Sequence, residues 1–145
     1  MPLIEWNNKM SVGIDQIDIQ HKKLVQIINN LHDALKNDSF EEVLRPVFME
    51  LIDYTKTHFS TEEDIMEKAG YKDLEHHRKQ HTMFVAKMMK MKNRCYQGKE
   101  EISVELISFL SSWIIGHILH SDKDYVETVR NSDWYKNYGK SLVVQ

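Results

Sequence analysis

Histidine and carboxylate side chains interrupt the apolar stripes of this chain at helical spacings. The seven residues are His21, His58, Glu62, His77, His81, His117 and Asp122. Imidazole nitrogens and carboxylate oxygens both bind transition metals, and a carboxylate can bridge two ions because it has two oxygens. A fold that brings these five imidazoles and two carboxylates together could therefore hold two metal ions.

Apolar residues recur at steps of three and four along four stretches of the chain, which predicts four amphipathic helices. The stripes extend over residues 14–35, 44–65, 74–95 and 102–117, and each contains at least one of the seven residues. Five glycines and two prolines in 145 residues favour long helices. The expected fold is all-α, an antiparallel up-and-down four-helix bundle with an N-terminal loop segment and a C-terminal tail, formed as a single domain over residues 1–145.

Local signals place some of the helix ends. A capping box from Ser39 to Glu42 precedes the second helix, and Asp73 is a suitable N-cap for the third. A proline inside a helix removes a hydrogen bond, so we expect Pro46 to distort the first turns of the second helix. If that helix begins near Leu44 instead, Pro46 becomes a favourable early position.

The positions of the candidate ligands along the predicted helices agree with one another. They lie early in the first and third helices and late in the second and fourth. In a bundle with short connections, the starts of helices one and three lie beside the ends of helices two and four. All seven side chains should therefore converge on one end of the bundle.

A single buried histidine is ordinarily a neutral, hydrogen-bonded core residue. Seven buried imidazoles and carboxylates without metal would leave roughly 1–3 kcal/mol of unfavourable free energy for each unsatisfied group. Bound cations would offset that cost, so a metal site is the preferred interpretation.

The spacing of the last pair needs a local distortion. Residues four apart on an α-helix differ by about 40° around its axis, which suits the pairs in the second and third helices. His117 and Asp122 are five apart, about 140°, which would turn Asp122 away from the core. Either a π-bulge separates them, or His120 is the ligand instead; we favour Asp122 because such bulges concentrate at functional sites.

The remaining histidines and the single cysteine have ordinary interpretations. His32 and His76 are expected at the surface or its boundary. His120 is expected to face solvent, with a hydrogen-bond partner of a ligand or a proton source beside the metal as alternatives. Cys95 is expected to be a small core residue, and as the only cysteine it cannot form an internal disulfide.

The chain resembles bacterial hemerythrins over nearly its full length. The resemblance is carried by Trp6, by SVGIDQIDIQH ending at His21, and by HFSTE (58–62), HRKQH (77–81) and HILHSD (117–122). It implies a four-helix bundle that binds two non-haem iron ions joined by a hydroxo or oxo bridge. The family also uses a carboxylate five residues after its last histidine, which supports Asp122 as a ligand.

The resemblance also assigns the ligands. It implies that His77, His81 and His117 hold one iron, that His21 and His58 hold the other, and that Glu62 and Asp122 bridge both. Including the hydroxo bridge, one iron then has six ligands and the other five, which leaves one position for dioxygen. Phe59, Trp113, Ile114 and Ile118 match the family's oxygen pocket, and they are also ordinary core positions of a bundle.

Reversible dioxygen binding for carriage, storage or buffering is the function that the resemblance implies. The alternative is a di-iron enzyme or sensor acting on dioxygen, peroxide or nitric oxide, and weak oxidase or peroxidase activity is compatible with the site. Five histidines differ from the carboxylate-rich sites of ferritin-like proteins, which use Glu-x-x-His pairs. We therefore expect a protein that is not primarily an enzyme.

Composition limits the partners. A net charge of −3 gives no basic stripe for nucleic acid and no polybasic patch for a membrane. The apolar runs are shorter than a bilayer span, and the N-terminus lacks a signal-peptide pattern. We expect a cytoplasmic monomer that binds dioxygen, with an oxygen-consuming protein as the candidate partner. Residues 131–145 are expected to pack back on the bundle, with a docking segment as the alternative.

Overall fold

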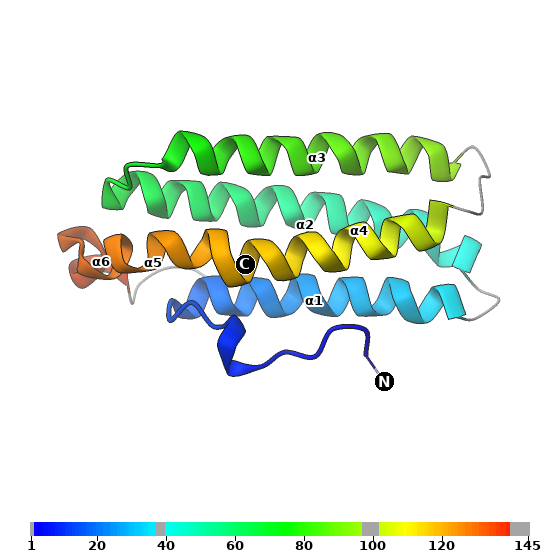
Figure 1. Ribbon diagram of the computed structural model, residues 1–145, viewed down its shortest axis with the longest axis horizontal. Helices are drawn as coiled ribbons and strands as arrows, with labels where there is room; N and C mark the ends of the chain where they lie inside the picture. Colours follow the sequence, from blue (N-terminus) through cyan, green and yellow to red (C-terminus); the bar gives the residue numbers. More distant parts are fainter. Residues whose placement is uncertain (1, 37–39, 97–101, 140–145) are drawn as a thin grey trace.

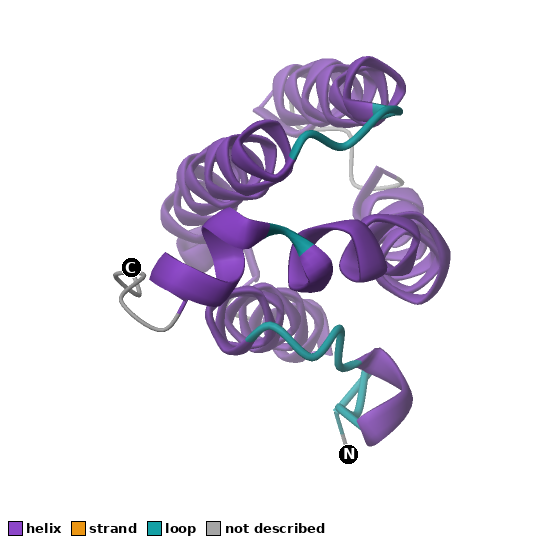
Figure 2. Cartoon of the chain, turned by 90° about the vertical axis from the view of Figure 1, so that its left-hand side faces the viewer, coloured by secondary structure: helices purple, strands orange, loops and turns teal. Residues whose placement is uncertain are grey.

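Four long helices form an antiparallel bundle in the computed structural model, which describes residues 2–36, 40–96 and 102–139. They are α1 (Asp15–Lys36), α2 (Phe40–Ala69), α3 (Leu74–Tyr96) and α4 (Ile102–Gly116). In space α1 lies against α2 and α4, and α3 also lies against α2 and α4 (Figure 1). The end-on view shows the helices arranged around a common core (Figure 2). The predicted all-α bundle is confirmed, and no strand occurs within the described ranges.

The fourth helix continues beyond Gly116 without a break in the helical path. A π-helical turn, η2 (His117–Ser121), joins α4 to α5 (Asp122–Asn131), and a short helix, α6 (Asp133–Tyr138), follows. The stretch Val104–Asn131 has 28 residues and contains an 18-residue window with a mean hydropathy of 1.2. By length and composition alone it could cross a membrane, and it is longer than the apolar runs of the sequence suggested. Core helices of bundles meet the same criteria, and in this stretch Leu106, Leu110, Ile114 and Ile118 are buried in the interior.

The connection between α2 and α3 is a tight glycine turn. Gly70 has φ +73°, which an L residue with a side chain rarely adopts. The Tyr71 N–H donates to the Met66 carbonyl, and the Gly70 N–H donates to the Glu67 carbonyl, the pattern of a Schellman motif. Asp73 then precedes α3, and its carbonyl accepts the first helical hydrogen bond, from the His77 N–H. This turn fixes the late part of α2 beside the early part of α3.

The N-terminal segment packs along α1, as Figure 1 shows. The amide side chain of Asn29 makes two hydrogen bonds of 2.9 Å with the backbone of Ile4, one to its N–H and one to its carbonyl. Nearer the helix start, the Asp18 carboxylate accepts from the Val12 N–H at 2.8 Å. The expected N-terminal loop is therefore an ordered strap, with a short 3₁₀ turn, η1 (Asn8–Met10).

Two apolar clusters fill the interior, and the candidate ligands lie between them. The larger cluster contains residues such as Leu24, Phe59, Phe84 and Ile118. The smaller contains Ile14, Ile17, Ile65, Met66, Tyr125 and Val129, among others. On each helix, the candidate ligands are flanked on one side by a residue of the larger cluster. On the other side they are flanked by a residue that belongs to the smaller cluster or packs against it. The polar layer therefore lies toward one end of the bundle, as expected, but a second apolar cluster closes that end.

Some expectations about the helix ends change or lie outside the described residues. Helix α2 begins at Phe40, as the capping-box position predicts, so Pro46 lies inside its second turn. The alternative start near Leu44 is therefore wrong. The capping box at Ser39 and Glu42, the side chain of Cys95 and the tail end 140–145 lie outside the described residues and side chains.

Candidate metal centre

A π-turn brings Asp122 to the inner face of the fourth helix. The Asp122 N–H donates to the carbonyl of His117, five residues earlier, so the helix holds one extra residue at this point. His117 is 7% exposed and Asp122 is fully buried. His120 lies on the outer side of the same turn and is exposed. The expected bulge is present, and the competing interpretation of His120 as the core ligand is not supported by its position.

One oxygen of each carboxylate faces the pair formed by His21 and His58. The Nε2 atom of His21 lies 2.9 Å from Asp122 Oδ2 and 3.2 Å from Glu62 Oε1. The Nε2 atom of His58 contacts Glu62 Oε1 as well. These four side chains offer ligand atoms that lie within 4.8 Å of one another.

The other oxygens face the three remaining histidines. Asp122 Oδ1 lies 2.8 Å from His117 Nε2 and 3.1 Å from His77 Nε2. Glu62 Oε2 lies 3.4 Å from His77 Nε2 and 3.7 Å from His81 Nε2. The structure thus brings all seven predicted residues together and divides the histidines into a pair and a trio, with both carboxylates between them.

Charge and burial act in opposite directions on the carboxylates. Burial alone would raise the pKa of Glu62, yet His58, His21 and His77 hold it well below its ordinary value. Burial and the nearby Glu62 charge would also raise the pKa of Asp122, but His117 and His21 outweigh them and lower it. Both side chains are therefore ionised and available as metal ligands near neutral pH.

The histidines respond unequally to the same surroundings. Burial lowers the pKa of His21 and His77, but hydrogen bonds and charges from Asp122 and Glu62 outweigh it and raise each pKa to about 9. Burial lowers the pKa of His58, and it lowers that of His81 to about 3. Without metal, protons on His21 and His77 therefore balance the two carboxylates.

The donor set fits a pair of metal ions. All five imidazoles direct Nε2 toward the carboxylates, although His81 Nε2 and His117 Nε2 then lie only 3.1 Å apart. Among the described residues, Glu62 Oε2 and Asp122 Oδ2 accept no well-aligned hydrogen bond, although His21 Nε2 is 2.9 Å from the latter. Converging lone pairs of this kind are the arrangement that nitrogen- and oxygen-binding transition metals require.

Two residues that the sequence pattern did not single out contact ligand rings on their outer side. Gln20 Oε1 lies 2.6 Å from His58 Nδ1, and Glu63 Oε2 lies 3.4 Å from His81 Nδ1. Each contact is made at the nitrogen opposite the site, which leaves Nε2 free for metal. Both residues directly adjoin a predicted ligand in the chain, but only the helix packing shows which imidazole each one reaches.

Aromatic and aliphatic side chains surround the trio of histidines. The Phe59 ring stacks on His81 with centroids 3.7 Å apart, and the Trp113 ring stacks on His117 at 4.3 Å. Ile114 and Ile118 are 2% and 1% exposed in the same cluster. Of the four residues expected to line an oxygen pocket, Phe59 and Trp113 thus contact candidate ligands, and Ile114 and Ile118 are buried in the same apolar cluster.

A four-helix bundle whose core holds two adjoining histidine and carboxylate groups defines a class of metal-binding helical proteins. Comparison with known proteins gives the family: residues 12–129 match the model for the hemerythrin HHE cation binding domain. The chain belongs to the hemerythrin family.

Relatives in sequence and structure agree. A bacteriohemerythrin of Pseudomonas aeruginosa is 39% identical over 132 residues, covering 91% of this chain and 85% of the relative. One of Clostridium acetobutylicum is 34% identical over 128 residues, covering 84% and 98%. The crystal structure of wild-type hemerythrin superposes with a TM-score of 0.77 at 26% identity, covering 88% of this chain and 98% of that one.

Proposed function

We propose that this protein reversibly binds dioxygen at a non-haem di-iron centre. The observation that carries the proposal is that Glu62 and Asp122 each direct one oxygen to the histidine pair and the other to the trio. A carboxylate placed in this way can bridge two ions. His77, His81 and His117 would hold one iron, and His21 and His58 the other.

The unequal division of the histidines supports binding of a small ligand. With the same two carboxylates on each side, the metal position at His21 and His58 has one protein ligand fewer. When bound, the iron pair supplies an open coordination position there and the two electrons that reversible dioxygen binding requires. The protein's contribution is to hold the ligands and to keep that position available.

Exclusion of water and acids is the second contribution of the chain. Phe59, Ile114 and Ile118 are buried, and Trp113 stacks on His117, so apolar groups cover the three-histidine side of the centre; the Phe59 ring also lies 6.0 Å from that of His58 in the pair. His120 faces outward and is not placed to protonate a ligand inside. A dry, acid-poor pocket favours reversible binding over irreversible oxidation.

Metal reconstitution tests the proposed ligand set. We expect the anaerobically reconstituted protein to hold two iron ions per chain and to take up dioxygen reversibly. Asp122→Asn removes the charge of one bridging side chain and should lower the iron content below two. Asp124→Asn, at an exposed position two residues on, makes the same charge change and should leave it at two. Equal iron content in both variants would contradict the bridging role of Asp122.

A further inference from the structure

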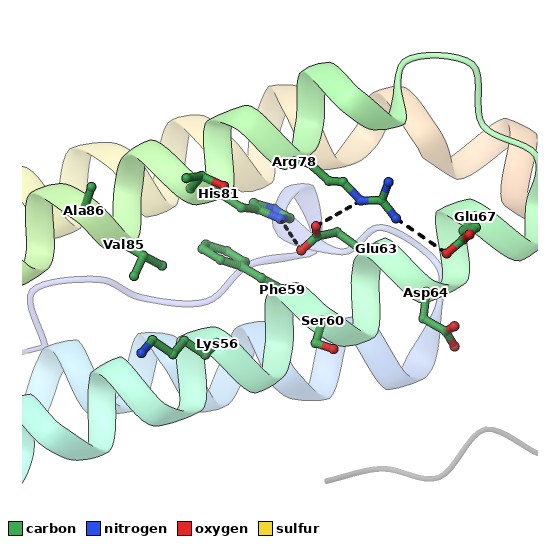
Figure 3. A pocket seen from close by; sticks show the side chains of 11 residues that line it. Lys56, Phe59, Ser60, Glu63, Asp64, Glu67, Arg78, His81, Val85 and Ala86 are labelled. Atoms are coloured by element: carbon green, nitrogen blue, oxygen red, sulfur yellow. Dashed lines mark hydrogen bonds and ion pairs between the residues drawn. The ribbon is translucent and has the colours of Figure 1, made fainter.

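A second carboxylate lies directly behind the metal centre. Glu63 follows Glu62 on α2 but points to the outer side, where its side chain is 24% exposed. Its Oε2 lies 3.4 Å from Nδ1 of the buried His81, on the side of the ring away from the candidate metal ligands (Figure 3). Glu63 and His81 line a surface groove between α2 and α3 of about 650 Å³.

Arg78 fixes this carboxylate in place. The Arg78 Nε lies 3.3 Å from Glu63 Oε1, so the two oxygens of Glu63 have separate partners. The same guanidinium also reaches Glu67 Oε2 at 3.5 Å, and it contacts Glu75. Since Arg78 and His81 are three residues apart on α3, one turn of helix presents both donors to Glu63, as the dashed lines in Figure 3 show.

The corresponding partner of His58 is neutral. Gln20 Oε1 lies 2.6 Å from His58 Nδ1, and an amide oxygen accepts the hydrogen bond without adding a charge. A carboxylate in the same role both fixes the tautomer and raises the basicity of the imidazole toward metal. The two ligand rings therefore have different outer partners, an anionic one for His81 of the trio and a neutral one for His58 of the pair.

We propose that Glu63, held by Arg78, is a positioning residue that directs Nε2 of His81 into the centre and strengthens it as a metal donor. The charge of Glu63 stabilises metal at the three-histidine position, the ferric ion most of all because it carries the higher charge. The metal part of this inference rests on the proposed function. The orientation of the ring is a property of the chain itself and holds without metal.

A simple surface ion pair is the competing explanation. Exposed pairs such as Arg78 with Glu67 contribute little to stability. Glu67 therefore provides a matched control: Glu67→Gln removes a charge from the same guanidinium on the same helix, but Glu67 has no described contact with His81. A difference in His81 tautomer or iron affinity between the Glu63 and Glu67 variants therefore reports the contact between Glu63 and His81.

Nitrogen NMR of the metal-free protein tests the orientation. With ¹⁵N-labelled histidine at neutral pH, we expect His81 to carry its proton on Nδ1 in the wild type and in Glu67→Gln. Glu63→Ala should give a mixture that includes the Nε2–H tautomer. Glu63→Gln should keep the wild-type tautomer because its amide oxygen still accepts. An unchanged His81 tautomer in Glu63→Ala would overturn the positioning role.

Competition with a ferrous chelator tests the donor strength. Mutation of a hydrogen-bond partner of a metal-binding imidazole typically weakens metal binding by about 10- to 100-fold. Glu63→Gln keeps the acceptor and removes only its charge, so we expect iron binding to weaken by the low end of that range, about tenfold, and Glu67→Gln to stay within about twofold. Equal iron affinities for these two variants would refute the claim that the charge of Glu63 strengthens His81 as a metal donor. If the wild type itself takes up no iron pair, the proposed function fails, whereas the tautomer measurement still tests Glu63.

Discussion

The extra residue in the η2 turn makes an unusual prediction about deletions. In a continuous α-helix, Asp122 would lie about 140° from His117, with Tyr125 about 80° and Val129 about 120° away. The π-turn rotates everything after it back by about 100°, which brings all three onto the inner face. Removal of His120, an exposed residue inside the turn, should convert it to regular helix and leave the three side chains within about 40° of His117. The variant should therefore retain its fold and two metal ions.

Deletion of Lys123 is the matched control, because this residue is also exposed but follows the turn. If the turn persists, Tyr125 and Val129, both 0% exposed, rotate out of the core. At about 1.5–3 kcal/mol for each buried side chain, the loss is about 4 kcal/mol. For a domain of this size that lowers the Tm by on the order of 10 °C. If the helix instead becomes regular, those side chains stay inside but Asp122 leaves the centre.

Circular dichroism melting and iron analysis of both variants decide between these outcomes. We expect the His120 deletion to melt within about 3 °C of the wild type and to bind two iron ions. The Lys123 deletion should either have a Tm lower by about 10 °C or bind fewer than two iron ions. A His120 deletion as damaged as the Lys123 deletion would refute the claim that η2 sets the register of Asp122 and α5.

Three further predictions concern the metal-free protein and its packing. Both His21 and His77 have pKa values raised to about 9 in the folded protein. Their protonated forms therefore stabilise the fold fully below the unfolded pKa of about 6.5, and this contribution is lost as the pH rises through about 9. The Tm of the metal-free protein should fall over that range, and a Tm independent of pH would contradict the balance of protons and carboxylate charges. The buried Tyr125 hydroxyl has no hydrogen-bond partner among the described residues, so Tyr125→Phe should be neutral or stabilising by up to about 1 kcal/mol in urea unfolding, and a loss of about 2 kcal/mol would reveal a missed partner. Trp134 packs on the smaller apolar cluster, so truncation after Asn131 should lower the Tm by several degrees, and an unchanged Tm would favour a docking tail.

The parts of the fold that follow from helix periodicity could be predicted from the sequence. Pairs four residues apart, such as His77 with His81, share a face in any α-helix, and the order of the ligands along four helices fixes their common level. These regularities need no knowledge of the neighbouring helices. They gave the bundle and six of the seven positions that the structure brings together.

The remaining features depend on tertiary contacts. The residue types between His117 and Asp122 do not by themselves predict a π-turn. The five-residue spacing predicts one only if both side chains belong to the same site, and the turn forms only if packing of the residues beyond it, such as Tyr125, favours the rotated register. Gln20 adjoins His21 in sequence but reaches His58 on another helix, so its role depends on the register of α1 against α2. The second apolar cluster behind the site was missed for the same reason, since its buried members come from α1, α2, α5 and the N-terminal segment.

An anaerobic optical titration of the iron-loaded, reduced protein with dioxygen tests the central claim most directly. We predict that a charge-transfer band appears, saturates at one dioxygen for two iron ions, and disappears when dioxygen is removed, over repeated cycles. Prompt oxidation that does not reverse, or continued consumption of dioxygen beyond that ratio, would contradict reversible binding and indicate an enzyme.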